Sequence, residues 1–144
     1  MKLFDIVGPV MIGPSSSHTA GAVKIGLIAR KLLGEKPVKA EILLHGSFAM
    51  TGSGHGTDRA IVAGIMGIRP DDERIPESFE IAHAGGLGFS IDTTHIPNAH
   101  PNSTMIKLQG EHGRKLELVA SSLGGGRIIV SRIDGITSHF SGDE

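Results

Sequence analysis

The chain contains no cysteine, no tryptophan and no tyrosine, and these absences exclude several kinds of protein before any motif is considered. Without cysteine, the 144-residue chain forms no disulfide and offers no thiolate ligand to a metal ion or an iron–sulfur cluster. Five phenylalanines are its only large aromatic residues, so the core must be built from Ile, Leu, Val, Ala and Met side chains.

Charge of one sign and long apolar runs are also scarce. The net charge is −1 and the isoelectric point is near 6.7, so the chain has no basic footprint for nucleic acid. No apolar run approaches the roughly 18 residues that cross a membrane, and residues 1–5 do not resemble a signal peptide. We therefore expect a cytoplasmic protein that binds neither nucleic acid nor membrane.

Several sequence motifs of cofactor and catalytic sites are missing as well. No GxGxxG segment follows a strand and there is no Walker A loop, which argues against nucleotide binding. No GxSxG elbow occurs, which disfavours a serine hydrolase despite the many serines. Eight histidines could supply a histidine-only metal site, but no HExxH or other ligand spacing is present, and we expect no metal site in this chain.

Glycine, in contrast, is abundant: 21 of 144 residues, about twice its usual share of ~7%. The glycines cluster at the ends of predicted elements, which indicates close backbone packing and shaped loops. Apolar periodicity predicts helices over residues 20–33, 60–67 and 76–84, and strands over residues 38–44, 104–108, 116–121 and 127–133. This order favours a single α+β domain with helices on one face of a mostly antiparallel sheet.

The most informative segment is residues 13–21 (GPSSSHTAG), which we expect to be a loop leading into the first helix. The first backbone N–H groups of a helix have no intrahelical partner and carry partial positive charge, so hydroxyl groups beside them suit a carboxylate or a phosphate. One serine would suffice as an N-cap, and capping is the structural alternative. The surplus of hydroxyl groups favours a ligand-binding loop.

A second segment, residues 51–58 (TGSGHGTD), precedes the buried helix over residues 60–67 in a similar way. It places His55 before that helix as His18 precedes the first, and His45 ends the first predicted strand. Histidine donates to carboxylates and moves protons near neutral pH. We expect the three histidines to line one open depression, although a lone histidine is more often structural.

Two further segments have open interpretations. Residues 95–104 (HIPNAHPNST) combine rigid proline with Asn and His side chains, which suits either a binding role or a stiff connector. Residues 124–126 (GGG) could cradle an anion through their N–H groups, but such a triplet between strands is more often a tight turn or a bulge.

Taken together and in order, these segments resemble the beta subunit, or beta domain, of bacterial iron–sulfur-dependent L-serine dehydratases (L-serine ammonia-lyases). The matching segments are residues 5–10 (DIVGPV), 13–19 (GPSSSHT), 45–58 (HGS through GHGTD), 100–104 (HPNST) and 122–126 (SLGGG). The resemblance covers most of residues 5–134. Its fold is similar to the allosteric substrate-binding domain of some phosphoglycerate dehydrogenases.

The resemblance implies a pyridoxal-independent conversion of L-serine to pyruvate and ammonia, within amino-acid degradation and gluconeogenesis. In such enzymes a [4Fe-4S] cluster with one open iron site acts as Lewis acid, and elimination of water leaves aminoacrylate. The cluster cysteines belong to an alpha subunit, the expected partner in a homo- or hetero-oligomer. We expect the beta domain over residues 1–136, a polar tail over residues 137–144, and no ACT-type regulatory domain in this sequence.

From the residues and the resemblance together we assign candidate roles. The candidate catalytic residues are His18, His45 and His55, and the candidate substrate-binding residues are Ser15, Ser16, Ser17, Thr19, Ser47, Thr57, Asp58 and Asn102. The alternative function is a non-catalytic domain that binds a small carboxylate as an allosteric effector and transmits the signal to a partner.

Overall fold

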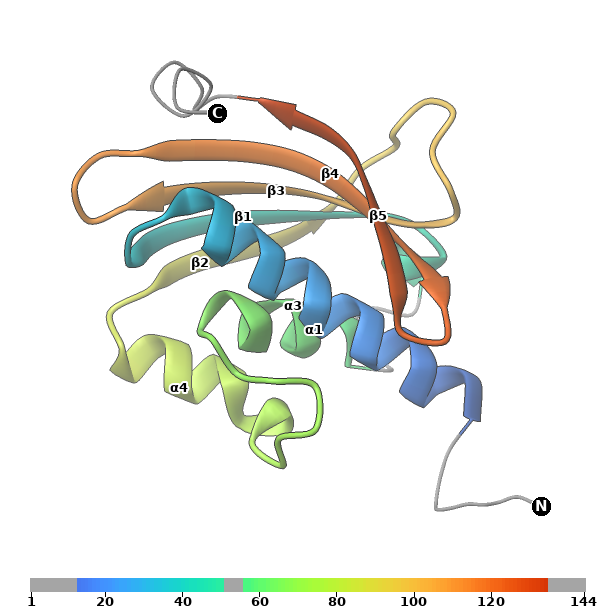
Figure 1. Ribbon diagram of the computed structural model, residues 1–144, viewed down its shortest axis with the longest axis horizontal. Helices are drawn as coiled ribbons and strands as arrows, with labels where there is room; N and C mark the ends of the chain where they lie inside the picture. Colours follow the sequence, from blue (N-terminus) through green and yellow to red (C-terminus); the bar gives the residue numbers. More distant parts are fainter. Residues whose placement is uncertain (1–12, 51–55, 135–144) are drawn as a thin grey trace.

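One five-stranded sheet, covered by helices on a single face, forms the protein (Figure 1). The computed structural model describes residues 13–50 and 56–134, without the side chains of residues 13–18 and 134. The elements are α1 (Gly13–Leu33), β1 (Pro37–Gly46), α3 (Thr57–Ile65), the 3-10 turn η1 (Ile75–Glu77), α4 (Ser78–Ala84), β2 (Gly88–Thr93), β3 (Asn102–Gly110), β4 (Lys115–Gly124) and β5 (Arg127–Asp134). Residues 47–50 are also helical. The predicted α+β class, with helices on one face, is confirmed.

The strands lie in the order β2-β1-β3-β4-β5, and all neighbours are antiparallel except β1 and β2. Side chains alternate between the two faces of each strand. In β1, Ala40, Ile42 and Leu44 are buried in the core beneath the helices, whereas Lys39 and Glu41 are exposed on the other face. We call that second side, which carries no helix among residues 13–50 and 56–134, the open face.

Strand β2 is absent from the sequence-based prediction, which left residues 88–92 unassigned and treated residues 93–102 as irregular. It pairs in parallel with β1 from Lys39↔Gly88 to Leu44↔Thr93. The strand is short and lies at the sheet edge, where Phe89 and Ile91 alternate with Ser90 and Asp92 and pack partly against the core. This alternation is a local signal for a strand, but it covers few residues and follows directly on the glycines at 85–88. Its partner β1 is distant in sequence, which removes the hairpin signal.

Helix α1 begins at Gly13, seven residues before the predicted start at residue 20. The expected loop over residues 13–19 is therefore wrong: these residues form the first two turns of the helix. Serine and threonine suggested a cap because they favour that position. Proline is tolerated in the first helical turn, where its missing N–H has no intrahelical role, so Pro14 is compatible with the earlier start.

Helices α1 and α3 pack together through Gly26 and Gly64. A Cβ on Gly64 would lie 2.8 Å from the Cα of Gly26 and 2.7 Å from the backbone nitrogen of Leu27, so no side chain fits there. Arg30, further along α1, donates a 2.9 Å hydrogen bond to the carbonyl of Ile65, further along α3. Gly64 therefore allows the close backbone packing that the abundance of glycine indicated, whereas Gly67, with φ of +86°, lies in the turn after α3.

Short turns connect the last three strands. The segment at residues 110–113 joins β3 to β4, and the glycine triplet at residues 124–126 joins β4 to β5 with all three glycines at positive φ. The glycine triplet is thus a tight turn.

Within residues 13–50 and 56–134, no helix is long and apolar enough to span a membrane.

Candidate functional site

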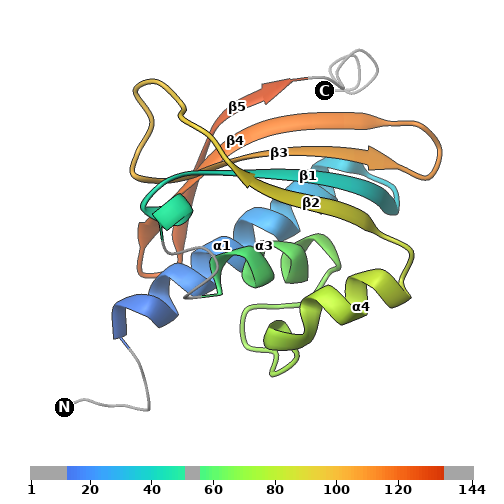
Figure 2. The same cartoon turned by 180° about the vertical axis from the view of Figure 1, so that it is seen from behind.

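Several of the candidate residues lie at one end of the sheet, where β1 finishes at Gly46. Both α1 and α3 begin at this end, and the helical residues 47–50 and the β4–β5 turn lie there too (Figure 1 and Figure 2). Gly21 of α1 faces Ser122 near the end of β4, with no room for a side chain between them. This Gly46 end brings two helix N-termini to the end of the first strand.

The start of α1 offers unpaired backbone donors at different residues from those expected. Because the helix begins at Gly13, the N–H groups without an intrahelical acceptor belong to residues 13–16, and Pro14 has none. Ser15 and Ser16 therefore contribute two of these donors, while Thr19 is half-buried in the second turn. The side chains of Ser15, Ser16, Ser17 and His18 lie outside the described part of the structure.

The start of α3 carries a negative charge of its own. Gly56, with φ of +80°, precedes the helix, and Thr57 and Asp58 follow it, both buried. The Asp58 carboxylate accepts a 2.7 Å hydrogen bond from the N–H of Arg59. A carboxylate in the first turn complements the helix dipole and repels a second anion, so this helix start suits a cation better than an anion. His55 lies outside the described residues.

His45 lies on the open face, whereas its neighbour Leu44 packs into the core beneath the helices. It pairs with Ser103 of β3 and is only 8% exposed. Its Nδ1 accepts a 2.9 Å hydrogen bond from the N–H of Ile96, and its ring lies 5.3 Å from that of His95. The expectation that His45 lines an open depression is therefore wrong, because residues 94–101 cover it.

Ser47 and Asn102 lie beside the connection formed by residues 94–101. The N–H of Ser47 donates to the carbonyl of Pro101 at 2.7 Å, and the N–H of Asn102 donates to Nδ1 of His100 at 3.0 Å. Ser47 is exposed and Asn102 is half-buried. These backbone bonds support a connector role for residues 95–102, while the side chains of Ser47 and Asn102 stay near the Gly46 end.

A buried pair of hydroxyl groups beneath this connection was not singled out in the sequence analysis. The Oγ atoms of Ser103 and Ser121 lie 2.7 Å apart on adjacent strands, and Ser103 also bonds the carbonyl of His100. Thr104 donates to the carbonyl of Leu43 at 2.9 Å. Serine at buried strand positions is the signal that could have identified the pair, since buried hydroxyl groups require partners.

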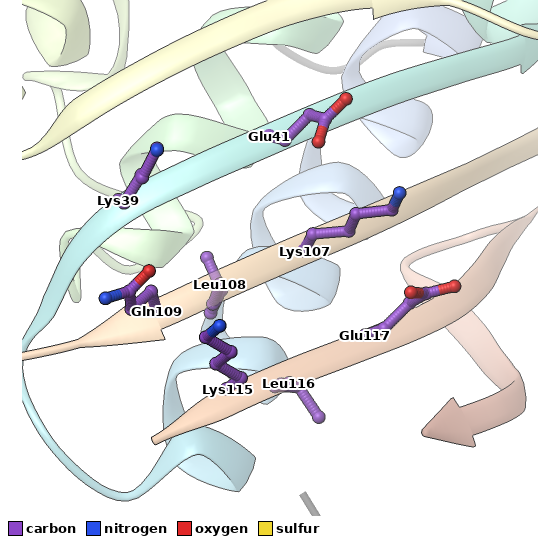
Figure 3. A pocket seen from close by; sticks show the side chains of 8 residues that line it. All are labelled: Lys39, Glu41, Lys107, Leu108, Gln109, Lys115, Leu116 and Glu117. Carbon is purple, nitrogen blue, oxygen red and sulfur yellow. The ribbon is translucent and has the colours of Figure 1, made fainter. Parts of the chain in front are cut away.

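The open face also carries a shallow hollow at its other end, lined by charged side chains (Figure 3). Glu41, Lys107 and Glu117 are cross-strand neighbours of alternating charge, and Arg132 of β5 extends the row with a 2.9 Å ion pair to Glu117. Such a row compensates its own charge and suits a solvated surface. The candidate residues lie at the opposite end of β1.

Metal ligands are not gathered in the described part of the chain. Within residues 13–50 and 56–134, no group of three His, Asp or Glu side chains is placed to hold a metal ion. None of the 144 residues is a cysteine. The residues of this chain therefore do not fit the ligand set of an iron–sulfur cluster, which is normally thiolate.

Replacing His45 with leucine should lower the free energy of unfolding by about 1–3 kcal/mol, because the buried N–H of Ile96 then loses its acceptor. Urea denaturation followed by circular dichroism measures the change. The matched control is His95→Leu, at an exposed neighbour that shares the ring contact but not this hydrogen bond. Equal stability of the two variants would contradict a structural role for His45.

Comparisons with a family model and with known proteins point to the same family. Residues 2–85 match the model of the family described as serine dehydratase beta chain. The chain is 47% identical over 141 residues to the L-serine dehydratase beta chain of Peptoniphilus asaccharolyticus, and 45% identical over 142 residues to the probable L-serine dehydratase beta chain of Bacillus subtilis. These matches cover 97% and 99% of this chain but 64% of each relative. L-serine dehydratase 2 of Escherichia coli is 44% identical over 153 residues, with 90% of this chain and 33% of the relative covered.

Proposed function

Because the chain belongs to the serine dehydratase beta-chain family, we propose that it forms one side of the active site of an L-serine ammonia-lyase. The enzyme removes water from L-serine, and the resulting aminoacrylate yields pyruvate and ammonia. The observation that supports this role most directly is the meeting of the α1 and α3 starts at the Gly46 end. The start of α1 offers backbone N–H groups that suit the carboxylate of serine, and the start of α3 carries the Asp58 carboxylate, which suits the ammonium group.

The two ends of the substrate are assigned to different helices. The carboxylate of serine binds at the start of α1, where the N–H groups of Ser15 and Ser16 lack intrahelical acceptors. Ser17 and Thr19 complete this side of the site. The ammonium group lies toward Asp58, whose carboxylate occupies the first turn of α3.

The remaining candidate residues complete the substrate site. Thr57, Ser47 and Asn102 surround the substrate at the Gly46 end, and His18 and His55 hold or move protons there. His45 contributes by positioning residues 94–101 rather than by touching substrate, because its Nδ1 already accepts the N–H of Ile96 in that connection.

The cluster is assigned to a cysteine-bearing alpha subunit, because this chain has no thiolate to offer. The partners are that subunit and L-serine, and the assembly works in the cytoplasm. The role of this chain is to bind and orient the substrate and to exclude water at the subunit boundary.

The test is reconstitution. The chain is incubated anaerobically with iron and sulfide, alone and with its alpha subunit, and followed by visible absorption and pyruvate formation from L-serine. We expect no cluster absorption and no pyruvate from the chain alone, and both from the pair. A brown, active protein obtained from this chain alone would overturn the assignment.

Replacing Ser16 or Ser17 with alanine keeps the backbone N–H and removes the hydroxyl group, which we propose as a further donor to the carboxylate of serine. Since a hydrogen bond to a charged group is worth about 1.5–3 kcal/mol, each replacement should raise the KM for serine by about one to two decades. A purely structural serine in the first turns would instead cost about 1 kcal/mol of stability and leave KM unchanged. Steady-state kinetics of the reconstituted pair and thermal unfolding of each variant separate the two roles. The exposed Ser90→Ala, on edge strand β2, is the matched control.

The second candidate function is a carboxylate-sensing domain without a catalytic role. The observation that favours it is the burial of His45, which removes one of three candidate histidines from an open site. Isothermal titration of L-serine distinguishes the functions. Tight binding to the chain alone supports the sensor, whereas binding that requires the alpha subunit supports the shared active site.

A further inference from the structure

A groove runs between the outer flank of α1 and the β4–β5 hairpin, on the far side of α1 from α3. It is lined by apolar and basic residues, namely Lys24, Leu27, Ile28, Leu123, Gly126, Arg127 and Ile128. We call it the Lys24 groove. The helix layer accounts for its existence, because α1 packs extensively on β4 but scarcely on the edge strand β5 (Figure 1).

The shape of the Lys24 groove is held by a contact across it. The ammonium group of Lys24 donates a 2.8 Å hydrogen bond to the carbonyl of Gly126, which ties the turn to the helix. The turn itself keeps its form through the positive φ angles of its three glycines. The groove is thus present in the free chain and needs no partner to form it.

Its surface is apolar in the middle and positive at the rim. Leu123 is 39% exposed, and Leu27, Ile28 and Ile128 are only partly covered. Lys24 and Arg127 are exposed beside them, and no acidic residue lines the groove. Helix α1 carries Lys24, Arg30 and Lys31 and no acidic residue along its whole length.

We propose that the Lys24 groove docks a segment of the partner subunit that carries apolar side chains flanked by carboxylates. The partner's identity rests on the proposed function, but the chemistry of the segment follows from the groove. An apolar strip bounded by two cations is complementary to apolar side chains with acidic neighbours. A segment that carries positive charge would instead be repelled by Lys24 and Arg127. The groove adjoins the Gly46 end through α1, so a subunit docked there also reaches the proposed site.

The experiment measures association of the full natural chain with the cysteine-bearing subunit of the same organism, by sedimentation at several salt concentrations. Arg127→Glu and Leu123→Ser should each weaken association about tenfold or more, and wild-type association should weaken as salt rises. Both residues are exposed, so the variants should fold, which circular dichroism checks. Lys115→Glu, in the hollow on the open face, makes the same charge change and should alter association by less than about twofold.

Three outcomes would count against the proposal, and they are distinguishable. Groove variants that bind the partner as tightly as wild type, in a pair that still forms pyruvate, overturn the groove and leave the proposed function intact. Variants that change only the self-association of this chain make the groove a contact between copies, which also overturns it. A wild-type chain that neither binds the cysteine-bearing subunit nor supports activity overturns the proposed function and the groove together.

Discussion

Replacing Gly64 with valine is expected to cause the largest loss of stability of any single substitution at the helix interface. A Cβ at this position would meet the Cα of Gly26 at 2.8 Å and the nitrogen of Leu27 at 2.7 Å, both of them backbone atoms that cannot turn aside. The helices would have to separate, and overpacking of this kind costs about 1–3 kcal/mol or more. Against a total stability of about 5–15 kcal/mol, we expect a large shift of the urea midpoint.

The consequence of Gly64→Val extends to the proposed site. The contact between α1 and α3 holds the starts of both helices at the Gly46 end, so their separation should also abolish serine turnover in the reconstituted pair. The matched control is Gly88→Val on the edge strand β2, where only the Val38 carbonyl lies nearby, 3.8 Å from a Cβ. Valine suits a strand, so this control should keep both stability and turnover. Comparable losses in the two variants would contradict the role of the glycine contact.

The fold class was predictable because its main signals are local. Helical periodicity around Ile25 and Ala29 and the alternation in β1 both follow from residues a few positions apart. The turn at residues 124–126 was also predictable, since it needs backbone angles that residues other than glycine rarely adopt. Strand β2 was not predicted because its pairing with β1 is distant in sequence and its alternation of Phe89 and Ile91 with Ser90 and Asp92 spans only a few residues.

The candidate site was predictable in part. The convergence of the two helix starts was a hypothesis based on the similar Gly/Ser/Thr-rich segments that precede the two helices, and the two starts do lie at the end of β1. The family resemblance is confirmed by the comparisons. The face on which His45 lies was predictable from the alternation in β1, which directs Leu44 to the core and His45 to the opposite face. Its burial depends on residues 94–101, which are distant in sequence. Asp58 was expected to bind substrate. That its carboxylate repels a second anion follows only from its position in the first turn of α3.

The second large effect is expected from His18→Ala and His55→Ala in the reconstituted pair. If these side chains move protons during elimination, each replacement should lower kcat by about 10²–10⁴-fold and leave subunit association unchanged. Loss of a proton-transfer group should also remove one limb of the pH profile of kcat, which loss of a structural group would not. Turnover across pH 5–9 and sedimentation of the pair measure the two effects.

The control for these histidines is His112→Ala in the exposed β3–β4 turn, at the far end of the sheet from Gly46. It removes an imidazole without touching the proposed site, so kcat, its pH profile and association should all be retained. Retention of kcat in both His18→Ala and His55→Ala would remove the proton-transfer role and favour the carboxylate sensor. Loss of kcat in only one of them would assign proton transfer to that histidine and leave the other to substrate binding, which a raised KM would then reveal.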